Sequence, residues 1–437
     1  MKPVSRGIDR IQVTFDEDSL VANAGLLLVS TVARKLGLEA LINSLVHIPS
    51  KRGGFLPGRK VLTLVHAMVA GASHIDHADV LRAGATGEVL DHRVMAPSTL
   101  GTFLRSFTFG HLRQLDAVIA EALRRAWIAM TLPACLVVDL DSTICEVAGK
   151  KKTGAAYGYT KALGYHPLLA TRQDTGEVLH ARMRKGSAHT ARGARRFICE
   201  TVARLRRAGA AGEMVFRMDS GFWSKKTIET LKRLSVRFTM AVKTGNPAIS
   251  RTISLIAEAD WVAIDYPEDG EAQVAQTTYS GLRLVVRRTR LVGPQASLWP
   301  NWRHFAFLTD LEGDAVELDA FHRQHAVTEL DIRDLKEGSG LEHCPSGNFF
   351  ANGAWLACAV LAHNLVRWTQ ILGELDDSDD HFRPAAARTV RIRFVSMPGR
   401  LVNRSGTPTL RAPSRWPWRL SFDHALCTLR TLSVAVT

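Results

Sequence analysis

The fold is decided at Leu136-Val137-Val138-Asp139-Leu140-Asp141-Ser142-Thr143. Large apolar residues, two of them β-branched, lead directly into two carboxylates, which predicts a buried strand with acids near its C-terminal end. Because side chains alternate along a strand, Asp139 and Asp141 point to the same face. Two like charges side by side in a buried sheet require a cation between them. We expect that cation to be a divalent metal ion.

A second stretch repeats this pattern. The mostly apolar run Met214–Met218 leads into Asp219, Gly221 allows a turn, and residues 224–234 have the pattern of a helix. An acid at the C-terminal end of a strand, followed by a turn and a helix, lies where α/β sheets bind their ligands. The sequence therefore predicts that the carboxylate of Asp219 belongs to the same site as Asp141.

The third candidate acid lies in the segment Asp319–Lys336, which has a helical pattern. At roughly 100° per residue, one helical face spanning about 80° collects an acid and four actual or potential cations. These residues are His322, His325, Glu329, Arg333 and Lys336. A face focused on one acid favours a site, whereas the alternative is an ordinary solvated face.

These three acids suit phosphodiester chemistry. Two divalent ions about 4 Å apart can hold both the attacking and the leaving oxygen of a displacement at phosphorus, and Mg²⁺ prefers carboxylate oxygens. Asp141, Asp219 and Glu329 are therefore the candidate catalytic residues and metal ligands, with two Mg²⁺ ions as cofactors that Mn²⁺ replaces. Asp139 shares the strand face of Asp141 and is a possible additional ligand.

The composition and net charge of the chain indicate a polyanionic partner. The 437 residues carry a formal net charge of +14, with 56 Lys and Arg against 42 Asp and Glu, which is typical of nucleic-acid binding; a solvated basic surface is the alternative. Double-stranded DNA is the expected partner, and its expected phosphate contacts are Lys336, Arg333, His325, His322, Lys150, Lys151 and Lys152. The six cysteines form no CxxC pair, which argues against a zinc ribbon.

The chain divides by composition into five predicted regions. Residues 1–130 are a helical DNA-binding or dimerising region that begins with a strand at Ile11–Phe15, and 131–245 are the first part of an α/β core. A β-rich insertion at 246–318 interrupts this core, and its helical second part follows at 319–373. Residues 374–437 form a small α+β tail with a basic hairpin, for which we expect Val390–Val395, a Met397-Pro398-Gly399 turn, Leu401-Val402 and Thr409-Leu410.

The order of these motifs resembles that of the DDE transposases of bacterial insertion sequences, in particular the transposase DDE domain group 1 family. The resemblance rests on Asp141-Ser142-Thr143, Arg217-Met218-Asp219-Ser220-Gly221-Phe222, Glu329 with Lys336 seven positions on, Gly164-Tyr165-His166-Pro167-Leu168, Cys344-Pro345-Ser346-Gly347, Ala362-His363-Asn364-Leu365 and Pro398-Gly399-Arg400-Leu401. It implies an RNase H-like catalytic core with a β insertion, Mg²⁺-dependent cutting at terminal inverted repeats, and strand transfer into target DNA. It also implies a homodimer, because two DNA ends must be paired.

The chain departs from the related insertion-sequence signature at two positions. That signature has Tyr and Arg seven and four positions before its glutamate, where this chain has His322 and His325. A histidine is largely neutral at pH 7, so these two contacts differ from those of the related proteins.

Two other functions fit part of the sequence. Asp139-x-Asp141-x-Thr143 after an apolar strand matches a haloacid dehalogenase-type phosphatase, with Asp139 as the nucleophile and Asp141 as the general acid and base. A catalytically decayed relative would bind DNA without cutting it. A cytoplasmic, nucleoid-associated location is expected, because the chain has no apolar signal-type segment and its longest apolar run is too short to span a membrane.

Overall fold

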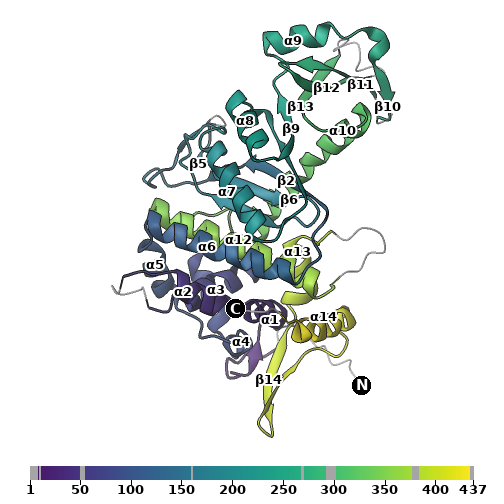
Figure 1. The fold of residues 1–437 in the computed structure, drawn as a ribbon. Helices are drawn as coiled ribbons and strands as arrows, with labels where there is room; N and C mark the ends of the chain where they lie inside the picture. Colours follow the sequence, from purple (N-terminus) through teal and green to yellow (C-terminus); the bar gives the residue numbers. More distant parts are fainter. Residues whose placement is uncertain are drawn as a thin grey trace.

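A nine-stranded mixed sheet is the largest element of the fold in the computed structural model, which describes residues 8, 11–49, 55–158, 161–266, 270–291, 302–375 and 383–433. Its strand order is β10-β11-β12-β13-β9-β8-β2-β6-β7. The sheet lies on one side of a layer of long helices, and the shorter N-terminal helices lie on the other side (Figure 1). The protein is therefore a mixed α/β fold.

The five strands at one end of this sheet form its core. They are β2 (Cys135–Ser142), β6 (Leu168–Arg172), β7 (Val178–Arg182), β8 (Glu213–Met218) and β9 (Arg237–Val242). β2, β8 and β9 run parallel to one another, and β6 runs antiparallel to both of its neighbours, β2 and β7. Helix α7 (Ala194–Arg207) precedes β8, and helix α8 (Lys225–Arg233) connects β8 to β9. The predicted strands before Asp141 and Asp219 are confirmed, and their carboxyl ends meet at one edge of the sheet.

The remaining strands extend the same sheet. They are β10 (Val262–Ile264), β11 (Gly270–Tyr279), β12 (Leu282–Leu291) and β13 (Arg303–Thr309). β13 pairs antiparallel with β9, so the segment predicted as a β-rich insertion adds strands to the core sheet. Helix α9 (Pro247–Ser254) also lies in this β-rich segment.

Helix α12 (Phe349–Leu372) joins the N-terminal helices to the sheet. It contacts α1 (Leu26–Lys35), α3 (Pro57–Val69), α5 (Pro97–Arg105), α6 (Phe109–Ile128) and strand β7. Figure 1 shows α6 and α12 side by side, between the sheet and the other N-terminal helices. α12 is long and apolar enough to cross a membrane, but most of it is buried inside the protein, as in the core helix of a globular fold.

One buried carboxylate links these layers. Glu177, in the tight turn between β6 and β7, accepts hydrogen bonds from Trp127 Nε1 at 3.0 Å and Trp368 Nε1 at 2.7 Å. Thr175 Oγ1 at 2.7 Å and Arg172 Nη1 at 3.2 Å complete its partners. Because a buried charge is stable only when it is paired and hydrogen-bonded, this one side chain holds α6, α12 and the turn in a defined arrangement.

The shorter elements complete the chain. The N-terminal half contains β1 (Leu20–Val21), α2 (Leu38–Leu45), η2 (Ile75–Arg82) and α4 (Thr86–Val89), and a small sheet beside the core contains β3 (Cys145–Glu146), β4 (Ala156–Tyr157) and β5 (Leu163–Tyr165). The C-terminal part contains α13 (Ala387–Val390), η8 (Arg391–Val395), β14 (Gly399–Arg404), β15 (Thr407–Arg411) and α14 (Arg419–Thr431).

Two local predictions are wrong. Ile11–Phe15 forms no strand, because no described segment pairs with it. Val390–Val395 is helical, since this conformation buries Phe394 and Val395 in the core and lets Gly25 N bond to the carbonyl of Val395. The hairpin therefore turns at Ser405-Gly406 and not at residues 397–399.

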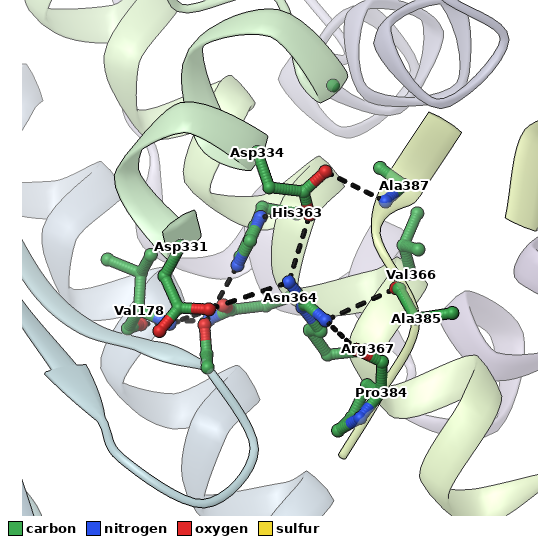
Figure 2. Close-up of polar contacts among 12 residues, drawn as sticks. Val178, Asp331, Asp334, His363, Asn364, Val366, Arg367, Pro384, Ala385 and Ala387 are labelled. Carbon is green, nitrogen blue, oxygen red and sulfur yellow. Dashed lines mark hydrogen bonds and ion pairs between the residues drawn. The ribbon is translucent and has the colours of Figure 1, made fainter. Parts of the chain in front are cut away.

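A buried ionic cluster joins α12 to one earlier and one later segment of the chain (Figure 2). Arg367 Nη2 donates to Asp334 Oδ2 at 2.9 Å, and Arg367 Nη1 donates to the carbonyl of Pro384 at 2.6 Å. The other oxygen of Asp334 accepts from Ala387 N at 2.8 Å. Arg383 adds a second cation, 2.9 Å from Asp331. The cluster thus ties the end of the Glu329-bearing segment to the core helix.

The neighbouring residues His363 and Asn364 on α12 hold the β6–β7 turn. His363 Nε2 donates to the carbonyl of Gly176 at 2.8 Å, and Asn364 bonds both the N–H and the carbonyl of Val178, at 2.8 Å and 2.9 Å. Burial, followed by the charge of Arg367, lowers the pKa of His363 to about 4. A neutral histidine is therefore part of the structure at physiological pH.

Removing the guanidinium of Arg367 tests how much this cluster contributes to the stability of the protein. Arg367→Ala leaves Asp334 buried without its cation, so we expect the free energy of unfolding to fall by about 3–5 kcal/mol. Arg388→Ala is the matched control, since Arg388 is exposed and has no partner among the described residues, and it should change stability by no more than about 0.5 kcal/mol. Urea denaturation measures both, and equal losses for the two variants would contradict this assignment.

Candidate active site

Asp141 and Asp219 lie at the carboxyl edge of adjacent parallel strands. Leu140 of β2 is in register with Met218 of β8, so the two aspartates are the next residues along neighbouring strands. Asp141 Oδ1 accepts from the N–H of Ser142 at 2.6 Å, and Asp219 Oδ1 accepts from Gly221 N at 2.7 Å, where it caps the short helix η3 (Ser220–Phe222). These backbone bonds orient both carboxylates at the edge of the sheet.

The charges of the two other predicted acids act on Asp141. Its pKa is raised to about 6, mainly by burial and further by the charges of Asp219 and Glu329, against the lowering effects of the Ser142 N–H and of His325. Glu329 lies on α11 (Thr328–Arg333) and is exposed. A carboxyl whose ionisation is opposed by burial, and to a lesser extent by neighbouring negative charges, lies where a cation would be stabilised.

The donor set fits a hard divalent cation in kind. All three side chains offer carboxylate oxygens, which Mg²⁺ and Mn²⁺ prefer. Within the described ranges, no three His, Cys, Asp or Glu side chains stand close enough together to hold an ion. Asp141 and Asp219 are held at the ends of their strands. A set of three carboxylate ligands would therefore be complete only when Glu329 lies close to both.

Asp139 has a different role from that of Asp141. Its cation is Arg217, which lies directly opposite it on β8 and binds it through two parallel hydrogen bonds, Nε to Oδ1 at 2.8 Å and Nη2 to Oδ2 at 2.7 Å. Both side chains are almost fully buried. Burial by itself would raise the pKa of Asp139, but the hydrogen bonds from His325 and Arg217 outweigh it and hold the pKa below its usual range. The prediction of a metal between Asp139 and Asp141 is therefore wrong for Asp139, whose charge is neutralised by a guanidinium.

The Asp139–Arg217 pair also anchors the segment that carries Glu329. His325 Nδ1 donates to Asp139 Oδ1 at 2.7 Å, and Arg217 Nη1 donates to the carbonyl of Phe321 at 2.8 Å. The segment is not the single α-helix predicted for Asp319–Lys336. It consists of α10 (Ala315–Arg323), the 3₁₀ turn η6 (Gln324–Val327), α11, and the π-helical turn η7 (Asp334–Gly338). The tighter η6 turn lies where His325 meets Asp139.

The packing of His322 argues against the phosphate contact predicted for it. Its ring stacks on Phe307 at 4.3 Å between centroids, and its Nδ1 lies 2.7 Å from Thr239 Oγ1. Burial, followed by the charges of His325 and Arg217, lowers its pKa to about 3. A neutral, packed imidazole offers no positive charge to DNA.

The other predicted DNA contacts differ in accessibility. Lys336 Nζ donates to the carbonyl of Ile144 at 3.1 Å, and Lys152 Nζ donates to the carbonyl of Cys344. Arg333, Lys150 and Lys151 are exposed and have no side-chain partner in the described part of the chain. Their role in DNA binding stays a prediction, as does that of His325.

Two side chains beside Asp141 were not singled out as site residues from the sequence. His166 Nδ1 donates to the carbonyl of Ala188 at 2.7 Å, so its Nε2 is left to accept from Ser142 Oγ at 2.9 Å. Burial lowers the pKa of His166, which the charge of Asp219 partly offsets. The signal for them was present in Gly164-Tyr165-His166-Pro167 and in Ser142 directly after Asp141.

The family of the chain follows from comparison with known proteins. The family described as Transposase DDE domain group 1 matches residues 5–434, nearly the whole chain, so the chain belongs to that family. Its activity is that of a DDE-type transposase, a class of enzymes that cut and join DNA. The resemblance seen in the sequence is confirmed, and the phosphatase alternative is not, since Asp139 is closed off by Arg217 and His325.

Other comparisons add little. The chain is similar to a solved structure described as "Cryo-EM structure of piggyBac transposase synaptic complex with hairpin DNA", with 12% sequence identity, a TM-score of 0.47, and coverage of 85% of this chain and 79% of that one. A likeness of this size carries no argument about function. No curated protein matches the chain.

The contrast between the two aspartates of β2 is testable. Asp139→Asn leaves Arg217 buried without a counter-charge, so we expect the free energy of unfolding to fall by about 3–5 kcal/mol. The pKa of Asp141 is raised in the folded protein, so its ionisation opposes folding above pH 6. Asp141→Asn removes this charge, and the metal-free variant should be as stable as wild type at pH 7 or more stable. Urea denaturation of both variants in the presence of a chelator measures this, and a larger loss for Asp141→Asn would contradict it.

The buried neutral His322 predicts an acid-dependent loss of stability. Its folded pKa of about 3 lies below the unfolded value near 6.5, so the unfolded state binds the proton first and stability is lost as pH falls below about 6.5. At pH 5 this amounts to about 2 kcal/mol. Urea denaturation at pH 7 and pH 5 should show a loss about 2 kcal/mol smaller for His322→Gln than for wild type. The exposed control His47→Gln should match wild type, and an unchanged pH dependence in His322→Gln would refute the assignment.

Proposed function

We propose that the chain is the transposase of an insertion sequence, which cuts DNA at the terminal inverted repeats of its element and joins the ends to target DNA. The catalytic residues proposed are Asp141, Asp219 and Glu329. The observation that carries this proposal is the raised pKa of Asp141 at the edge of two parallel strands, where the charges of both other acids act on it.

The three carboxylates would hold Mg²⁺, with Mn²⁺ as a substitute. When bound, the metal supplies positive charge to the oxygens that enter and leave the phosphorus centre. The chain supplies the positions of the ligands. Asp141 and Asp219 are fixed by backbone hydrogen bonds at the ends of β2 and β8, and the Asp139–Arg217 pair holds the segment that carries Glu329 against the same strands.

An RNase H-like core is supported by the arrangement of five strands. Among these five strands, the central strand β2 has the antiparallel strand β6 on one side, with β7 beyond it, and the parallel strand β8 on the other, with β9 beyond it. The first two acids then lie on the two strands at the centre. We propose that β10–β13 belong to an insertion in this core that extends its sheet beyond β9.

Double-stranded DNA is the proposed partner, and a homodimer the proposed assembly, because both ends of an element must be held together. The net charge of +14 supports a polyanionic partner. Exposed cations are consistent with this, notably Arg333, one helical turn after Glu329, and Lys150 and Lys151, which follow β3 in the chain. The proposed location is the bacterial nucleoid.

Cleavage of element-end DNA tests the proposal. The substrate is a duplex carrying the inverted repeats that flank the gene for this chain, incubated with Mg²⁺. We expect wild type to cut it and Asp141→Asn, Asp219→Asn and Glu329→Gln to bind it but fall to background cleavage. Glu337→Gln is the matched control, since Glu337 is exposed on the next turns of the same segment and should cut as wild type does.

Three results would each reject part of this proposal. Full cleavage by any of the three variants removes that residue from the catalytic set. Binding without cleavage by wild type, under Mg²⁺ and Mn²⁺ alike, would identify a catalytically decayed relative. Hydrolysis of a small phosphomonoester in preference to DNA would favour the phosphatase chemistry instead.

A further inference from the structure

The hairpin of β14 and β15 projects from the body of the protein (Figure 1). Its strands pair from Arg400↔Arg411 to Arg404↔Thr407, and two residues, Ser405 and Gly406, close it. Both have positive φ angles, 52° and 82°, as a tight two-residue hairpin turn requires. The hairpin is therefore a short two-stranded ribbon with a defined twist.

The two faces of the ribbon differ in composition. Leu401 and Leu410, a directly opposed pair, pack against the hydrophobic core on one face. The opposite face, the basic face, consists of Arg400, Val402, Arg404, Thr407, Thr409 and Arg411. It contains three arginines, two threonine hydroxyls and no acid, and nearly all of it is exposed.

The chain itself neutralises only part of this charge. Arg400 lies directly opposite Arg411, an arrangement of like charges that destabilises a strand pair. Arg400 is compensated by Glu17 at 2.7 Å and by Ser19 Oγ at 2.9 Å. The guanidinium groups of Arg404 and Arg411 have no hydrogen-bond or ion-pair partner in the part of the chain that the structure describes. The basic face thus presents guanidinium groups that are free to bind an anion.

We propose that the basic face of the β14–β15 hairpin binds the sugar–phosphate backbone of DNA, with Arg404 and Arg411 as its phosphate contacts. This rests on the proposed function, from which the polyanion follows. A two-stranded ribbon is narrow enough to enter the major groove, and arginine and threonine are common donors to phosphate oxygens. The hairpin and the sheet that carries Asp141 lie on opposite sides of the helical layer (Figure 1). The hairpin would therefore contact the DNA at a distance from the bond that is cleaved.

The outer edge of the ribbon argues against a protein partner. A sheet edge pairs with another chain through its free N–H and C=O groups, and proline or charged side chains prevent this. β15 is the edge strand of its sheet and carries both Pro408 and Arg411. The ribbon is therefore better suited to present its face to a charged ligand than to pair its edge with a second copy.

Salt-dependent DNA binding tests the proposal. Fluorescence anisotropy with a labelled duplex of mixed sequence gives the slope of log Kobs against log salt concentration, and each phosphate that the protein neutralises contributes about 0.9 to the magnitude of this slope. We expect Arg404→Ala/Arg411→Ala to reduce that magnitude by about 1.8. The control Arg207→Ala/Arg251→Ala removes the same charge from two exposed arginines on α7 and α9, and its slope should stay at the wild-type value.

The outcomes separate this proposal from the proposed function. If the hairpin variant and wild type have equal slopes, the hairpin assignment is overturned and the catalytic triad is unaffected. The same holds if the hairpin variant loses self-association but keeps the wild-type slope for DNA binding. Absence of DNA binding by wild type overturns both. A melting temperature equal to that of wild type confirms that the hairpin variant is folded, and Arg404→Lys/Arg411→Lys should restore most of the slope because it keeps both charges.

Discussion

The rest of the active-site structure depends on the buried ion pair between Asp139 and Arg217. The two residues are 78 positions apart in the chain but directly opposite on β2 and β8. Breaking such a pair costs about 3–5 kcal/mol, because the remaining charge is left buried. Its unused hydrogen-bonding capacity holds Phe321 and His325, so the same pair that joins the two acid-bearing strands also places the Glu329 segment against them.

The helical layer is built on the same principle of buried charge satisfied at long range. Glu177 receives one indole N–H from α6 and another from α12, and Arg367 of α12 binds Asp334 at the end of the Glu329 segment (Figure 2). Apolar burial holds the layers together, but it has no direction. These few polar contacts give the layers a fixed angle and register.

The excess of basic residues serves two purposes. Several arginines are internal, where Arg172, Arg184, Arg204 and Arg367 bind buried carboxylates or backbone carbonyls. Others, such as Arg333 beside Glu329 and Arg404 and Arg411 on the hairpin, are exposed and unpaired among the described residues. The net charge alone does not distinguish these groups, and only the exposed ones contribute to long-range attraction of DNA.

Local patterns in the sequence determined the strands before Asp141 and Asp219, the helical character of residues 319–373 and the family, because apolar spacing acts over a few positions. They failed for Val390–Val395, whose β-prone residues become helical when Phe394 and Val395 are buried. They also could not show that Asp139 binds Arg217 or that His322 is packed and neutral. Only the tertiary structure decided these, because the partner of a buried charge comes from a distant part of the chain, and the free energy of its pairing exists only once both strands are in the sheet.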